Sequence, residues 1–158
     1  MAGTIFADKT PFIEALEEMS PNYRFVFLRP RRFGKSAFLN MLTVYYDIHA
    51  ADMFDDLFGP LYIGNKPTES KNQLLVLKFN LSSVDISRSS DNIATSFNLV
   101  INDVLRRFLQ EYCKELGSPE EESIIDDTSA SRSLTRVMVS YRLLCTKKKK
   151  GAKRKELI

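Results

Sequence analysis

Eight consecutive residues combine the side chains and the spacing needed to bind phosphate. Residues 29–36 read Arg-Pro-Arg-Arg-Phe-Gly-Lys-Ser, and their end matches the phosphate-loop pattern G-x-x-x-x-G-K-[ST]. In that pattern, glycine lets backbone N–H groups approach phosphate oxygens, lysine reaches the β- and γ-phosphates, and the hydroxyl binds Mg²⁺. Arg29 stands where the pattern has its first glycine.

The residues predicted to bind a phosphate ligand follow from this match. Lys35 would contact phosphate, Ser36 would be the ligand of Mg²⁺, and the arginines would strengthen the positive field. The predicted cofactor-binding residues are Arg31, Arg32, Phe33, Gly34, Lys35 and Ser36. The alternative is a surface turn with solvated arginines, but such a dense group of cations is costly without an anion.

The neighbouring residues predict the two elements that must position this loop. Residues 23–28 are aromatic and β-branched and lie between Pro21 and Pro30, which predicts a buried strand. After the loop, apolar residues from Phe38 to Tyr46 recur at steps of three and four, which predicts a helix with one apolar face. A strand, a loop and a helix in this order form the context that a phosphate loop requires.

Further helices and one further strand are predicted along the chain. Helical spacing is found over residues 12–19, 91–116 and 134–144, and Thr10 is a candidate N-cap before Pro11. Residues 74–81 form a nearly continuous apolar run, typical of a strand covered on both faces. This order predicts an α/β fold with a short parallel sheet flanked by helices, although two strands make a thin sheet.

The octapeptide at 29–36 resembles the signature of the AAA-ATPase-like family of P-loop proteins, in which the first position is commonly not glycine. The residues 8–10, Asp-Lys-Thr, resemble the lead-in to the family's first helix, and residues 47–58 resemble the stretch after its P-loop helix. Residues 76–82 and 133–136 are similar to its second strand and to the segment before its Walker B strand. The resemblance implies a partial P-loop NTPase fold over residues 1–145, with ATP and Mg²⁺ as cofactors.

The acidic Walker B motif, which positions Mg²⁺ for hydrolysis, is not recognisable in the sequence. The resemblance places it after residue 145, so that either the chain is cut before the motif or it has diverged from the family there. Weaker candidates are Asp126 with Asp127, Asp85, and Asn80 with Ser82; the alternatives are a solvated loop and strand-end capping. No catalytic residue is assigned, and we expect weak ATP binding with poor or absent hydrolysis.

The positive charge of the chain is concentrated at its end. The net charge is +3, yet residues 147–158 carry seven basic side chains and one acid, against 16 bases and 19 acids in the rest. We predict a disordered basic tail over residues 146–158, because like charges four residues apart oppose a helix. Residues Lys147–Lys155 are a candidate site for a polyanion or nucleic acid, with a solvated tail as the alternative.

Composition excludes several classes of protein. Hydrophobic residues make up 44% of the chain, which is typical of a globular protein, and no apolar run is long enough to cross a membrane. Charged residues within the first twenty exclude a signal-peptide core, so we expect an intracellular protein of the cytoplasm or nucleus. Cys113 and Cys145 are predicted to be buried thiols, and His49 a helix-end or solvent-exposed residue.

Three functions remain open from the sequence. The first is an ATP-binding P-loop domain, whose partner is a nucleotide. The second is a nucleic-acid-binding or interaction module that uses the basic loop and tail. The third is a non-functional fragment, since an unpaired parallel edge promotes aggregation.

Overall fold

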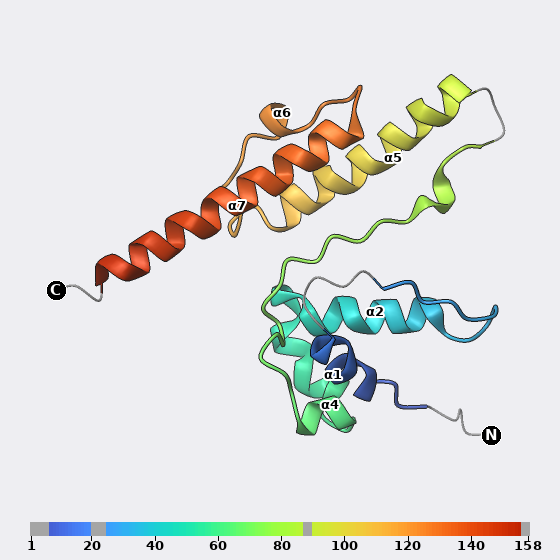
Figure 1. Ribbon diagram of the computed structural model, residues 1–158, viewed down its shortest axis with the longest axis vertical. Coiled ribbons are helices and arrows are strands. Elements are labelled where there is room, and N and C mark those ends of the chain that lie inside the picture. Colours follow the sequence, from blue (N-terminus) through green and yellow to red (C-terminus); the bar gives the residue numbers. More distant parts are fainter. Residues whose placement is uncertain (1–6, 20–24, 87–89, 156–158) are drawn as a thin grey trace. The chain divides into compact units, whose positions relative to one another are not determined.

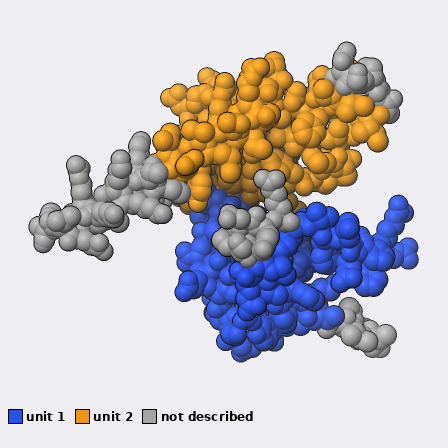
Figure 2. All heavy atoms as spheres, in the orientation of Figure 1, with its two compact units in different colours: residues 1–76 blue, residues 77–158 orange. Residues whose placement is uncertain are grey.

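The computed structural model describes residues 7–19, 25–86 and 90–155 (Figure 1). The chain forms two compact units, which Figure 2 shows in different colours: unit 1 over residues 1–76 and unit 2 over residues 77–158. The predicted division into a domain over residues 1–145 and a basic tail over residues 146–158 stays a prediction.

Unit 1 is built from short helices packed around aromatic side chains. Its elements are α1 (Pro11–Glu18), α2 (Lys35–Tyr46), the 3₁₀ helix η1 (Ile48–Met53), α3 (Phe54–Phe58) and α4 (Tyr62–Asn65). The buried core cluster consists of Ile13, Tyr45, Phe54, Phe58 and Ile63. Tyr45 is fully buried, with ring centroids 6.0 Å from Phe54 and 5.5 Å from Phe58. This core holds the end of α2 against α1, α3 and α4.

The predicted parallel sheet is wrong for the residues that the structure describes. Over 7–19, 25–86 and 90–155 there is no β-strand, and the only pairing is an isolated parallel bridge between Asp47 and Leu74. Residues 25–30 and 75–80 are extended without a ladder, and Val26 and Leu28 are 79% and 81% exposed. A β-strand needs a continuous ladder of hydrogen bonds to a neighbouring segment, and no such strand is assigned to these two apolar runs in the described part of the chain. Residues 23 and 24 of the first predicted strand lie outside the described residues.

Unit 2 is a hairpin of two long helices. It contains the 3₁₀ helix η2 (Leu81–Ser83), α5 (Ser90–Glu111), α6 (Glu121–Ile124) and α7 (Ala130–Lys155). The buried apolar residues of α5 and the turn after it include Leu105 and Tyr112, and Val137 is buried on α7. Asn98 of α5 accepts a hydrogen bond from Ala130 N (3.0 Å) and donates one to Thr128 O (3.0 Å). Asn98 therefore satisfies backbone groups where α7 begins.

The prediction of a disordered tail is also wrong, because α7 continues through Lys155. The predicted helix covered 134–144, whereas the observed helix begins at Ala130 and includes residues 146–155. Adding a residue to an existing helix costs much less than starting one, and lysine has good helix propensity. Basic residues also interact favourably with the C-terminal end of the helix dipole. These effects favour continuation of the helix, whereas repulsion between neighbouring lysines opposes it. Residues 156–158 lie outside the described residues.

In the described part of the chain, every helix is too short or too polar to cross a lipid bilayer. The thiol of Cys113 is partly buried and forms no disulfide. The side chain of Cys145, predicted to be buried, lies outside the part that the structure describes.

Candidate functional site

The loop of residues 29–34 leads directly into the N-terminus of α2. Gly34 is the N-cap of α2 and has left-handed backbone angles, φ 73° and ψ 27°. Arg32 also has a positive φ of 66°, which is uncommon for a residue with a side chain and costs roughly 1–2 kcal/mol. Backbone that alternates in handedness forms concave groups of N–H donors that bind anions. The N–H groups of the first turn of α2 add further donors and the positive end of the helix dipole.

The side chain of Lys35 folds back over this loop. Its Nζ donates to Arg29 O at 2.6 Å and to Pro30 O at 2.9 Å. An ammonium group has three donors, so carbonyl contacts of this kind hold the charge at the loop without neutralising it. The predicted contact of Lys35 with phosphate stays a prediction; in the structure its ammonium contacts carbonyl groups of the loop.

Aromatic contacts attach the beginning of α2 to its surroundings. The ring of Phe38 is 5.3 Å from Phe27 in a stacked arrangement and 6.2 Å from Phe12 in an edge arrangement. Phe38 is 9% exposed, although Phe12 and Phe27 are about half exposed. Residues 25–30 therefore position the loop through side-chain packing, which is the task that the predicted strand was expected to perform.

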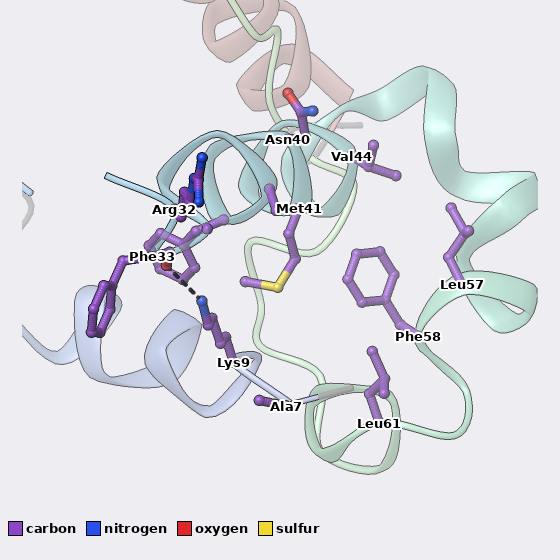
Figure 3. Close-up of a pocket in the computed structure, with 13 residues that line it drawn as sticks. Ala7, Lys9, Arg32, Phe33, Asn40, Met41, Val44, Leu57, Phe58 and Leu61 are labelled. Carbon is purple, nitrogen blue, oxygen red and sulfur yellow. Dashed lines mark hydrogen bonds between the residues drawn. The ribbon is translucent and has the colours of Figure 1, made fainter. Parts of the chain in front are cut away.

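A second lysine, which the sequence analysis did not assign to the site, also contacts the loop. Lys9 Nζ donates to Phe33 O at 3.0 Å, and Figure 3 shows this bond as a dashed line. The same Nζ would lie 2.7 Å from a Cβ atom added to Gly34. The loop thus has one ammonium from its own helix and another from the segment before α1.

The segment that carries Lys9 is fixed by the residues on either side of it. Asp8 accepts hydrogen bonds from Thr10 N (2.8 Å) and from Tyr62 N (2.9 Å), at the start of α4. Burial alone would raise the pKa of Asp8, but these bonds together lower the pKa below its usual value. Thr10 is fully buried, and its Oγ1 accepts from Ile63 N at 3.2 Å. Thr10 occupies the N-cap position of α1, but its side chain makes no capping bond there, because it is bound to α4.

Beside the loop lies a cavity of about 770 Å³. One end is lined by Lys9, Arg32, Phe33 and Gly34, and the rest is mainly apolar. The apolar lining residues include Met41, Leu57, Phe58 and Leu61, and Met41 and Phe58 project into the same space in Figure 3. A volume of this size is within the range of small-molecule sites, which combine apolar walls with a few polar groups.

The predicted binding residues lie together on this loop, but their exposure differs from that of a closed site. Arg31, Arg32, Phe33, Lys35 and Ser36 are exposed, and Gly34 is partly buried. Arg32, Phe33 and Gly34 also line the cavity. The role of each residue, including Ser36 as a ligand of Mg²⁺, stays a prediction.

The candidate acids of unit 2 bind groups of their own unit. Asp126 accepts from Thr128 N at 3.0 Å and from Thr128 Oγ1 at 2.6 Å, and forms an ion pair of 3.0 Å with Arg132. Asp127 forms an ion pair with Arg106 of α5. These contacts organise the loop that leads into α7.

The remaining candidates have local structural contacts. Asn80 Oδ1 accepts from Ser82 N at 3.1 Å and from Ser82 Oγ at 2.8 Å, so Asn80 caps the 3₁₀ helix η2 and not the end of a strand. Asp85 donates its N–H to Ser96 Oγ at 2.9 Å. His49 is exposed in η1, and its N–H donates to Asp47 Oδ1 at 2.9 Å.

The Asp126→Asn substitution is expected to lower the melting temperature of the chain by a few degrees. Hydrogen bonds from the Thr128 hydroxyl and N–H, with the charge of Arg132, hold the pKa of Asp126 below its usual value against the effect of burial. The stabilisation from the charged form is therefore present at neutral pH and is lost as the pH falls through the lowered pKa. Thermal melts of the wild type and of Asp126→Asn at neutral and acidic pH measure this pH-dependent difference in melting temperature.

Asp103→Asn is a suitable control for that substitution, because Asp103 forms an exposed ion pair with Arg107 one turn away on α5. Exposed pairs contribute little, so the control should melt close to the wild type. An equal effect of the two substitutions would contradict the structural role of Asp126.

Comparison with curated proteins gave no match, and comparison with solved structures gave none either. A family model described as "Predicted AAA-ATPase" (AAA-ATPase_like) matches residues 1–149. The match covers nearly all of the chain, including the loop of residues 29–36 and both units. The chain therefore belongs to the AAA-ATPase-like family of predicted AAA-ATPases.

Proposed function

We propose that this chain binds ATP together with Mg²⁺ at the loop of residues 31–36. The observation that carries the proposal is the position of Lys35, whose ammonium lies over the loop carbonyls at the N-terminus of α2. Left-handed Gly34 and Arg32 shape the backbone there, and the family match supports a nucleotide as the ligand. Phosphate would interact with the N–H groups of the loop and the first turn of α2.

Each predicted residue has a chemical role in this proposal. Lys35 would exchange its carbonyl contacts for phosphate oxygens, which are stronger acceptors because they are charged. Arg31 and Arg32 would add positive field, and the Ser36 hydroxyl would bind Mg²⁺, which prefers oxygen ligands. When bound, Mg²⁺ would neutralise phosphate charge.

The apolar cavity supports a nucleotide in preference to inorganic phosphate. It extends from the loop, at Arg32 and Gly34, to the apolar side chains Leu57 and Leu61. The purine ring of a nucleotide has apolar faces that can pack against such walls. The phosphates of the nucleotide would reach the cationic end of the cavity. We propose that the base lies in this cavity.

We propose that the chain binds ATP, and we assign no residue to ATP hydrolysis. Hydrolysis also needs a carboxylate that positions Mg²⁺ and a group that orients the attacking water. The weaker candidates Asp126 and Asp127 form ion pairs within unit 2, with Arg132 of α7 and Arg106 of α5. Accordingly, Asp126→Asn is expected to leave the affinity for ATP unchanged while it lowers the melting temperature.

Isothermal titration calorimetry of the purified chain with ATP in the presence of Mg²⁺ tests the proposal. We expect saturable binding to one site, and loss of most of that affinity in Lys35→Ala. Absence of binding to the wild-type chain, or equal binding to the variant, would contradict it.

The Leu57→Trp substitution tests the place of the base. Leu57 lines the cavity and is 49% exposed, so a larger side chain can be accommodated without disrupting the buried core. The indole should occupy space needed by the base and weaken ATP binding roughly 10-fold, equivalent to about 1.4 kcal/mol. Inorganic tripolyphosphate, which has no base, should bind the variant and the wild type equally in the same calorimetric titration.

A substitution at an exposed apolar residue of unit 2, Leu99→Trp, is the control for Leu57→Trp. It should bind ATP and tripolyphosphate as the wild type does. Equal ATP affinities of Leu57→Trp and the wild type would contradict the assignment of the base to this cavity.

A further inference from the structure

The surroundings of Lys9 differ from those of an ordinary surface lysine. Its side chain is partly buried, lines the cavity and donates one hydrogen bond, to Phe33 O. Lys66, by comparison, forms an ion pair with Glu14. In the described part of the chain, Lys9 has no carboxylate partner. An ammonium group without a counter-charge favours the approach of an anion.

Among the described residues, the nearest acid in the sequence, Asp8, forms no ion pair with Lys9. Both carboxylate oxygens of Asp8 accept backbone N–H groups, one from Thr10 and one from Tyr62. The other charged side chain that lines the cavity is Arg32, which is also a cation. Lys9, Arg32 and the neighbouring Lys35 therefore repel one another until an anion is present.

From this arrangement we infer that Lys9 is a second phosphate-binding lysine of the site, contributed by the segment before α1. The inference rests on the proposed function. Lys9 uses one of its three donors on Phe33 O, so the others can bind a phosphate oxygen while that bond is kept. Its Nζ lies beside Gly34, the N-cap of α2, where the loop donors and the helix dipole are directed.

The flanking contacts explain how a residue remote in sequence from the loop is delivered to it. Asp8 and Thr10 attach to the first residues of α4, and the buried Ile13 fixes α1 in the core of unit 1. Lys9, between them, is directed toward the loop. Because the backbone on both sides is already fixed, little further conformational entropy is lost when Lys9 binds a ligand.

The inference is tested by calorimetric titration of the full chain with inorganic tripolyphosphate and with ATP in Mg²⁺. Lys9→Met keeps an unbranched side chain and removes the charge, whereas Lys9→Arg keeps the charge. We expect Lys9→Met to weaken the affinity for both ligands by about 10-fold, because one charge-assisted hydrogen bond is lost. Lys9→Arg should restore most of the affinity.

Two further measurements separate a phosphate contact from a structural contact. The affinity of Lys9→Met should fall less steeply with added salt than that of the wild type, because one ionic contact is absent. Its melting temperature without ligand should change little, while its ligand-induced rise should shrink. Lys66→Met, at an exposed lysine on another part of unit 1, should bind both ligands as the wild type does.

The possible outcomes distinguish the two proposals. If Lys35→Ala loses affinity and Lys9→Met does not, the inference about Lys9 is overturned and the proposed function stands. If Lys9→Met loses stability without ligand and keeps the salt dependence of the wild type, Lys9 is a structural residue and the inference is overturned. If the wild-type chain binds neither ligand, both proposals are overturned.

Discussion

Replacing Lys35 by alanine is expected to remove about half or more of the rise in melting temperature that ATP and Mg²⁺ give to the wild-type chain. The Lys35 ammonium is held over the loop by Arg29 O at 2.6 Å and Pro30 O at 2.9 Å. Those contacts leave its charge available to phosphate. The loss of a charge-assisted hydrogen bond costs about 1.5–3 kcal/mol, which weakens binding roughly 10- to 100-fold.

The size of the thermal shift follows from linkage between binding and folding. A ligand at 100 times its Kd stabilises the native state by about 2.7 kcal/mol. For a domain of the size of unit 1, this corresponds to a rise on the order of 10 °C. At the same ATP concentration, Lys35→Ala should keep about half of that rise if its affinity falls 10-fold, and only a small part of it if its affinity falls 100-fold. Thermal melts followed by circular dichroism, with and without ATP, measure the difference.

Two controls make this result specific. Lys114→Ala removes an exposed lysine of unit 2 and should keep the full shift. Replacing Lys147–Lys150 by glutamine removes charge from the tail and should also keep it. A shift that survives undiminished in Lys35→Ala, or one that disappears in the glutamine variant, would place the ATP contact elsewhere and favour the basic tail as the polyanion site.

The parts of the site that could be predicted from sequence are those with a local cause. Gly34 is needed because the backbone has φ 73° there, and the 3.6-residue period after it defines α2. Both signals lie within a few residues of the loop. The same local reasoning located α1 and most of α5, whose apolar residues also recur at helical spacing.

The prediction of two strands was wrong because a β-strand is defined by its hydrogen bonds to a neighbouring segment. Residues 25–30 and 75–80 have the apolar composition of strands, but apart from the bridge between Asp47 and Leu74 no ladder forms in the described part of the chain. Amino-acid composition indicates whether a segment favours a strand conformation. Whether the segment pairs depends on which other segment lies beside it in the fold. The family resemblance is confirmed, while the sheet that it implied is not observed.

Lys9 and the cavity could not be predicted because they depend on contacts between distant residues. Asp8 meets Tyr62, 54 positions away, and Lys9 meets Phe33, 24 positions away. No spacing in the sequence specifies these contacts. The available signal was a cation between two residues whose side chains readily accept backbone hydrogen bonds, Asp8 and Thr10.

Truncation of Tyr45 to alanine is expected to have the largest effect on stability. Tyr45 is fully buried at the end of α2 and packs against Phe54 and Phe58. Removing a buried aromatic ring typically costs about 3–5 kcal/mol, a large part of the total stability of a small domain. Urea denaturation followed by circular dichroism should show a much lower midpoint.

Tyr45→Phe separates the ring from the hydroxyl. The hydroxyl accepts from Thr68 N at 2.8 Å and bonds to Thr68 Oγ1 at 3.0 Å, while Thr68 Oγ1 also donates to Glu17 at 2.8 Å. Phenylalanine keeps the packing and leaves Thr68 N without this acceptor, so a loss of about 1–2 kcal/mol is expected. Truncation of the half-exposed Tyr141 to alanine, in unit 2, should cost less than Tyr45→Ala.

The same variants test whether the core of unit 1 supports the loop of residues 29–34. Tyr45 is near one end of α2 and Lys35 begins the other, so the core fixes the helix whose N-terminus forms the site. Tyr45→Phe should keep the core and therefore keep ATP binding. Tyr45→Ala should lose ATP-dependent stabilisation although every loop residue is present. Full ATP binding by Tyr45→Ala would show that the loop forms its site without the helix core, and would contradict this dependence.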